Sequence, residues 1–112
     1  MTEGAWLLRD GEVLAALEVA HTRRDRMRGL LGRDGIDGAL LLRPARSVHT
    51  FRMRFAIDVA FVDRNLVVLD MCTMRRQRLG RPRLRAHGVI EAERGAFDRW
   101  ALKRGDKLEI KA

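Results

Sequence analysis

The chain has 112 residues, of which 46% are hydrophobic and 34% charged, and its net charge at pH 7 is +8. This length and apolar content suit one domain, 1–112, with an ordinary hydrophobic core, and exclude a disordered chain. No apolar run is long enough to cross a bilayer, the N-terminus does not resemble a secretory signal, and Cys72 is the only cysteine, so we expect a cytoplasmic protein.

The first part of the chain predicts a hairpin followed by a short helix. Two strand-like runs flank Asp10-Gly11, a dipeptide typical of a type I′ turn. A helix is predicted over 22–31, with Thr22 as its N-cap and Gly32 as its left-handed stop. The apolar stripe expected to pack on the sheet consists of Met27, Leu30 and Leu31.

The remaining elements are predicted to be mostly strands. A buried strand is expected over 38–42, and a second hairpin spans 57–74, with Asn65 in the left-handed position of its turn. A long loop over 75–85 leads to a strand closed by Gly95, and a helical turn, a tight turn and a last strand follow. The sum is an α+β domain, mainly antiparallel, with about seven strands and one or two short helices in a small closed or half-closed barrel.

The segment SVHTFRMRFAIDVAFVD, residues 47–63, places many polar side chains among apolar ones. Strand periodicity puts Asp58 on the opposite face from Ile57 and Val59, among small apolar residues. A bare carboxylate is costly there, so we expect Asp58 to pair with a backbone amide or with one of Arg52, Arg54 and His49. Two interpretations stay open: a polar pair with His49 at the mouth of an apolar pocket, or a structural acceptor that fixes the preceding loop.

His49 and Thr50 allow a similar choice between ligand contact, acid–base chemistry and a structural hydrogen bond. The ligand-binding candidates are His49, Thr50, Arg54 and Asp58. No serine or cysteine lies in a recognisable nucleophile motif, so no catalytic residue is assigned. The histidines and Cys72 lack the paired spacing of metal ligands, and the glycines form no phosphate loop, so we expect neither metal nor cofactor.

The stretch RRQRLGRPRLR, residues 75–85, concentrates positive charge and contains no acid. Its anion-binding candidates are Arg75, Arg76, Arg78, Arg81, Arg83 and Arg85. Three interpretations are open: solvated surface charge, docking on an anionic macromolecule or lipid surface, and binding of small anions. No aromatic residue is interleaved for base stacking, and no known DNA-binding motif is evident.

Four segments together resemble the family called domain of unknown function 192, over residues 23–110. They are MRGLL at 27–31, HTFRMRFAIDVAFVD at 49–63, VIEAERG at 89–95 and the closing GDKL at 105–108. The resemblance implies a compact domain of mixed β and α structure from a family without an established activity or cofactor, so it transfers no catalytic residue. Two departures from the family pattern, Arg52 in place of glycine and Ala56 in place of proline, affect the expected shape of the central loop.

The sequence therefore favours a small, non-enzymatic domain that binds a ligand or partner around His49, Thr50, Arg54 and Asp58. The alternative is an adaptor whose arginine loop docks on nucleic acid, an anionic membrane or an acidic protein. A third hypothesis, an acid–base enzyme that uses His49 and Asp58, has no accompanying nucleophile or metal cluster.

Overall fold

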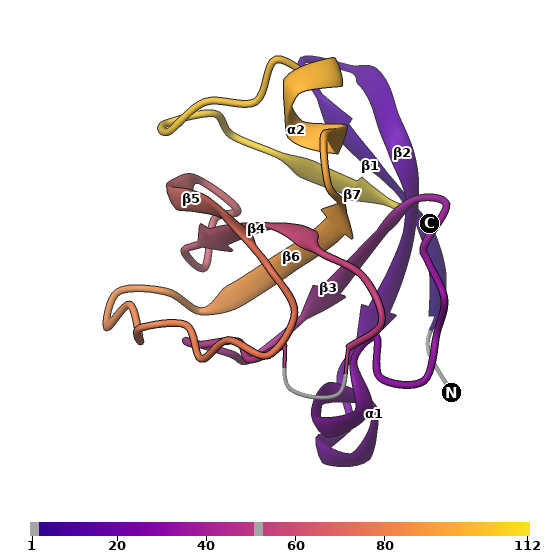
Figure 1. Cartoon of the computed structure of the whole chain (residues 1–112). Helices are drawn as coiled ribbons and strands as arrows, with labels where there is room; N and C mark the ends of the chain where they lie inside the picture. The colour runs from indigo at the N-terminus through magenta and orange to yellow at the C-terminus, as the bar shows by residue number, and fades with distance from the viewer. Residues whose placement is uncertain (1–2, 51–52) are drawn as a thin grey trace.

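A seven-stranded sheet with two short helices forms the framework of the protein, whose computed structural model describes residues 3–50 and 53–112 (Figure 1). Its strands are β1 (Glu3–Arg9), β2 (Glu12–Ala20), β3 (Ala39–Leu42), β4 (Ile57–Val62), β5 (Val68–Met74), β6 (Gly88–Glu93) and β7 (Glu109–Lys111). The helices are α1 (Arg23–Arg28) and α2 (Ala96–Arg99). Neighbouring strands in the order β5-β4-β6-β3-β2-β1-β7 are antiparallel except β2 and β3. The predicted α+β class is confirmed.

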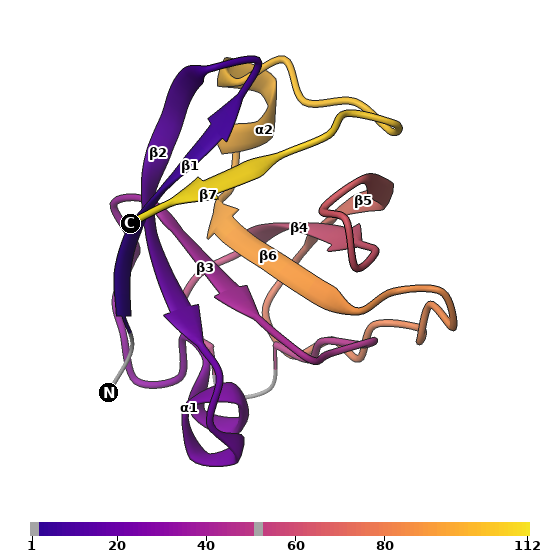
Figure 2. The same cartoon turned by 180° about the vertical axis from the view of Figure 1, so that it is seen from behind.

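The sheet curls around its core but does not close into a barrel, as both views show (Figures 1 and 2). Its edge strands are β5 and β7, which do not pair along their length. The segments that precede β5 and β7 contact each other. An isolated bridge joins Val67 to Lys107, and the amide of Leu108 donates to the carbonyl of Leu66 at 3.0 Å. Of the predicted closed or half-closed barrel, the closed form is wrong, because β5 and β7 form no ladder with each other.

The N-terminal elements match the predicted hairpin and correct the predicted helix. Asp10 and Gly11 have φ angles of 53° and 79°, as a type I′ turn requires. In α1 the hydroxyl of Thr22 accepts from the amide of Asp25 at 3.0 Å, which confirms the N-cap. The helix ends earlier than predicted, at Gly29, where the backbone turns. Leu30 is buried as a result, whereas Met27 is 67% exposed and does not pack on the sheet.

The β4–β5 hairpin is confirmed, but its turn differs in detail. A carboxylate oxygen of Asp63 accepts from the amides of Asn65 at 2.8 Å and Val67 at 3.0 Å. These two bonds shape the connection so that Leu66, with φ of 64°, occupies the left-handed position predicted for Asn65. The prediction for Asn65 was therefore wrong by one residue.

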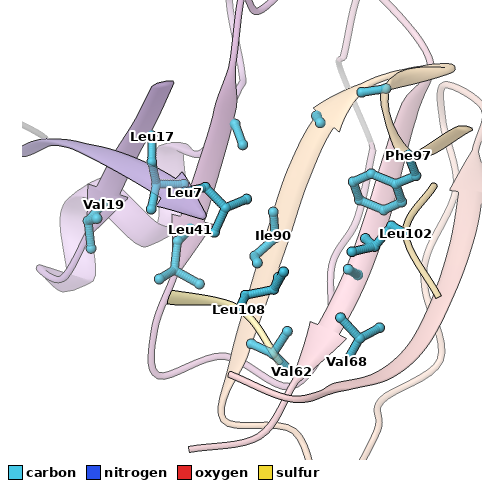
Figure 3. Close-up of a cluster of buried hydrophobic side chains, with 14 residues drawn as sticks. Leu7, Leu17, Val19, Leu41, Val62, Val68, Ile90, Phe97, Leu102 and Leu108 are labelled. Atoms are coloured by element: carbon cyan, nitrogen blue, oxygen red, sulfur yellow. The ribbon is translucent and has the colours of Figure 1, made fainter. Parts of the chain in front are cut away.

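Alternating side chains pack into two hydrophobic clusters on opposite faces of the central strands. The inner cluster lies within the curl of the sheet and joins strands from both halves (Figure 3). Its large members are Leu7, Leu17, Val19, Leu41, Val62, Val68, Ile90, Phe97, Leu102 and Leu108. The outer cluster lies on the other face and is covered by the loops and the chain after α1. Its large members are Leu30, Ile36, Leu40, Leu42, Val48, Met53, Ile57, Val59, Phe61, Met74 and Val89.

The two helices lie toward opposite ends of the molecule in both views (Figures 1 and 2). α1 has six residues and α2 has four, so within residues 3–50 and 53–112 no helix has the length and apolar character needed to span a membrane.

Candidate functional site

A small cavity of about 70 Å³ lies over the outer cluster, between the end of α1, the segment around His49 and strand β6. Apolar and polar side chains contribute to its wall in nearly equal measure. The lining residues are Arg26, Met27, Arg28, Gly29, Leu30, Leu31, Leu42, Ser47, Val48, His49, Met53 and Glu91. We call this the Glu91 cavity.

Glu91 is the buried acid of this cavity. Its register partner on β4 is Val59, so its side chain shares the face of the outer cluster. The residue is only 3% exposed, and no hydrogen bond or ion pair joins its carboxyl to any residue in the described part of the chain. The carboxyl lines the cavity, so its oxygens keep some contact with the space inside it. A largely buried carboxyl without a protein partner is unusual in folded proteins.

Burial raises the pKa of the Glu91 carboxyl from 4.5 to about 7, and the positive charge of Arg33 opposes this rise only in part. The Arg33 guanidinium is itself bound in two places by the Glu18 carboxylate, at 2.6 and 3.0 Å. Near neutral pH the Glu91 carboxyl therefore exists in both forms. The protonated form can donate one hydrogen bond, and the ionised form only accepts.

Gly29, at the end of α1, lies beside this carboxyl. Its φ of 49° lies in the left-handed region that favours glycine. A Cβ atom placed there would lie 3.6 Å from Oε1 of Glu91, so the turn after α1 forms part of the cover over the carboxyl.

Asp58 is also buried, but it lies on the inner face and has its hydrogen bonds satisfied. Its Oδ1 accepts from the hydroxyl of Thr73 at 2.8 Å. Its Oδ2 accepts from the amides of Gly95 at 3.0 Å and Phe97 at 3.1 Å, which are free donors at the start of α2. The carboxylate thus caps α2 across the sheet. A backbone amide was among the expected partners, but we expected one near Asp58 in the sequence, and these two amides lie well downstream. The segment that the carboxylate fixes is α2 and not the preceding loop.

The other ligand-binding candidates do not share one site. His49 lines the Glu91 cavity, whereas Asp58 lines a separate cavity of about 360 Å³ with Thr73, Cys72 and Phe97 among its neighbours. An acid–base pair of His49 and Asp58 therefore lacks a common cavity. Arg54 forms an exposed ion pair with Asp34 at 2.8 Å, and Arg52 lies outside the described residues.

Thr50 is fully buried and forms hydrogen bonds with the backbone of residues 75–85, which we call the arginine loop. Its hydroxyl donates to the carbonyl of Arg75 at 2.6 Å and accepts from the amide of Arg78 at 2.8 Å. With these bonds made, the hydroxyl faces a backbone turn and not the Glu91 cavity, whose lining does not include Thr50.

Of the six arginines in residues 75–85, one has a half-buried side chain bound within the fold, and five have exposed side chains. Arg83 is half-buried: its guanidinium binds the Asp70 carboxylate at 3.0 Å and lies 4.1 Å from the ring centre of Phe61. The exposed side chains belong to Arg75, Arg76, Arg78, Arg81 and Arg85. Arg83 is thus part of the fold, and five of the six anion-binding candidates remain on the surface.

Neither a metal centre nor a reactive thiol is evident in the described residues. No three His, Cys, Asp or Glu side chains within residues 3–50 and 53–112 gather as metal ligands would. Burial raises the pKa of the Cys72 thiol, which disfavours the nucleophilic thiolate.

Sequence reasoning did not single out Glu91, although it lies in the VIEA segment. Period-two alternation places Glu91 on the same face as the apolar Val89, and a lone acid on such a face is the signal that would have identified it. Three of the four segments that carry the family resemblance contribute to the Glu91 cavity: 27–31, 49–63 and 89–95.

Comparison with known proteins agrees with this resemblance. The model of the DUF192 family, described as "Uncharacterized ACR", matches residues 6–110. A UPF0127 protein of Pyrococcus horikoshii is 38% identical over 63 residues, which cover 56% of this chain and 55% of the relative. A UPF0127 protein of Thermococcus gammatolerans is 33% identical over 98 residues, which cover 82% of this chain and 64% of the relative. The chain thus spans about half to just under two thirds of these relatives.

Two solved structures share the fold. A protein of unknown function from Novosphingobium aromaticivorans has a TM-score of 0.75 at 18% identity, covering 96% of this chain and 84% of its own. A protein from Sinorhizobium meliloti, provisionally described as a transcription regulator, has a TM-score of 0.81 at 17% identity, covering 98% of this chain and 94% of its own. On the family match over residues 6–110, the chain belongs to the uncharacterised family DUF192.

Proposed function

We propose that this protein is a small binding domain whose ligand places a short end group with a hydrogen-bond donor in the Glu91 cavity. The observation that carries this proposal is the Glu91 carboxyl, which is buried at the cavity without a partner among the described residues. A ligand donor would supply the hydrogen bond that this carboxyl lacks.

The size of the cavity limits what can enter. About 70 Å³ is far below the roughly 300–1,000 Å³ typical of pockets that enclose a drug-sized molecule. The cavity therefore suits a few non-hydrogen atoms at the end of a ligand or side chain. The rest of the ligand would lie on the surface beside His49 and Ser47.

The wall chemistry supports an amine or hydroxyl on a short apolar stem. Leu30, Leu42 and Val48 offer apolar contacts to the stem, and Glu91 offers one acceptor. The ionised carboxylate would attract an ammonium group, against the repulsion of Arg26 and Arg28, which also line the cavity. The protonated carboxyl would still accept from a hydroxyl through its carbonyl oxygen.

Butylamine and butanol are suitable probes, with methyl propyl ether as a probe of similar size without a donor. Binding would be followed by amide chemical shifts of the isotope-labelled full chain. We expect shifts at residues 29–31 and 91 with the amine or the alcohol, and much smaller shifts with the ether.

Glu91→Leu removes the acceptor while keeping a similar volume, and Glu93→Leu makes the same change at an exposed position on the same strand. We expect Glu91→Leu to abolish the shifts and Glu93→Leu to retain them. Equal shifts in the two variants, or none in the unmodified chain, would overturn the proposal.

A further inference from the structure

Residues 75–87 form the long loop between β5 and β6 (Figure 1). This loop combines exposed positive charge with exposed apolar side chains. Leu79 is 72% exposed and Leu84 is 80% exposed, the highest values among the large exposed hydrophobic residues in the described part of the chain. Both leucines lie among arginines, with Arg78 and Arg81 around the first and Arg83 and Arg85 around the second.

The backbone of this loop is held in place, so the exposed side chains belong to an ordered surface. Thr50 donates its amide to the carbonyl of Arg78 at 2.7 Å, and Gly80 donates to Val48 at 2.7 Å. Arg83 donates to the carbonyl of Arg46 at 2.9 Å, and an isolated bridge joins His49 to Leu79. Two leucines thus remain exposed on a segment that is tethered at several points.

We propose that this loop docks on the surface of an anionic lipid bilayer. The exposed arginines would bind lipid phosphates and carboxylates, and Leu79 and Leu84 would insert among the headgroups. The surface defined by Arg75, Arg76, Arg78, Leu79, Arg81, Leu84 and Arg85 is called the arginine–leucine surface below. It is separate from the Glu91 carboxyl, so it can act whether or not the cavity binds a ligand.

A bilayer fits this surface better than nucleic acid does. A bilayer accepts both cations and apolar side chains, whereas exposed leucines add little to contacts with phosphates. No aromatic residue lies within 75–85 for stacking on bases. The net charge of +8 would also draw the protein toward a negatively charged membrane.

Sedimentation with vesicles tests the proposal on the full chain. Vesicles of phosphatidylcholine alone would be compared with vesicles that also contain phosphatidylserine, at low and at physiological salt. We expect binding to the phosphatidylserine vesicles only, and we expect it to weaken as salt rises.

Matched variants show whether binding depends on this surface or only on the net positive charge of the protein. Each arginine near an anionic membrane contributes about a fivefold gain in binding, so Arg75→Gln with Arg76→Gln should lower binding about 25-fold. Arg23→Gln with Arg24→Gln removes the same charge from exposed positions on α1 and should have a much smaller effect. Leu79→Ser with Leu84→Ser should lower binding at constant charge, whereas Val13→Ser, at a residue 58% exposed, should not.

Several results would overturn the proposal. They are no binding to phosphatidylserine vesicles, equal loss from the two arginine pairs, and no loss from the leucine pair. Tighter binding to duplex DNA or to an acidic polypeptide at the same salt, unaffected by the leucine pair, would assign the surface to those partners instead.

Discussion

Asp58 on β4 and Glu91 on β6 point to opposite faces of the same pair of strands. In their antiparallel register, Asp58 pairs with Ala92 and Glu91 pairs with Val59, so the two acids are neighbours along the sheet without sharing a face. Asp58 accepts three hydrogen bonds, whereas Glu91 accepts none from the described residues. One acid is thus satisfied within the fold, and the other is the acceptor that we propose for a ligand.

Replacing Asp58 with Ala should destabilise the protein. The change leaves the amides of Gly95 and Phe97 without their acceptor at the start of α2, and we expect a loss of about 1–3 kcal/mol in the free energy of unfolding. Urea denaturation measures this loss. Asp34→Ala is the control, since it breaks an exposed ion pair of the kind worth at most about 1 kcal/mol. Equal midpoints for the two variants would contradict the capping role.

Glu91 should make stability depend on pH. Its pKa rises from 4.5 unfolded to about 7 folded, so between these values the folded protein binds more protons than the unfolded one. The free energy of unfolding contributed by this group is therefore complete below pH 4.5 and decreases by about 3 kcal/mol as the pH rises to 7.

Glu91→Gln removes the ionisation and should remove this slope. Urea denaturation of both proteins at pH values from 4 to about 8 would give the difference curve, to which unaltered groups contribute equally. We expect the variant to gain stability relative to the unmodified chain as the pH rises. Parallel curves would show that the Glu91 carboxyl ionises normally in the folded protein.

Turns, caps and strand faces, which are determined by residues close in the sequence, could be predicted. The hydrogen-bond partners of the site residues, which lie far away in the sequence, could not. The Asp10-Gly11 turn, the Thr22 cap and the face of Asp58 follow from local chemistry and strand periodicity. The capping of α2 by Asp58 joins residues 37 and 39 positions apart, and only the sheet brings them together. For Glu91 the sequence did contain a signal, but interpretation centred on the more polar segment 47–63.

Thr50 allows a test of whether a predicted ligand contact is structural. Thr50→Val keeps the side-chain shape but leaves the Arg78 amide and the Arg75 carbonyl without their hydroxyl partner, so we expect a loss of about 1–3 kcal/mol. Thr50→Ser retains the hydroxyl and is the matched control, with a smaller loss from the missing methyl group. Thermal unfolding compares the two. If serine and valine were equally destabilising, packing of the methyl group and not the hydrogen bonds would hold the loop.

Gly80 of the arginine loop packs against Val48, which lines the Glu91 cavity, and the Gly80 amide donates to the Val48 carbonyl. Replacing Gly80 should loosen this contact. A Cβ atom at this position would lie 2.8 Å from the carbonyl oxygen of Val48, which is closer than packed atoms approach. The backbone must therefore shift, and we expect Gly80→Ala to lower the free energy of unfolding by about 1–3 kcal/mol. Gly35→Ala adds the same atom where no neighbour lies within 4 Å, so it should leave the thermal midpoint nearly unchanged. In Gly80→Ala, amide exchange at Arg78 and Gly80 should also accelerate, because both amides donate to the 48–50 segment. Unchanged exchange at these amides would show that the loop accommodates the added atom and keeps its hydrogen bonds to residues 48–50.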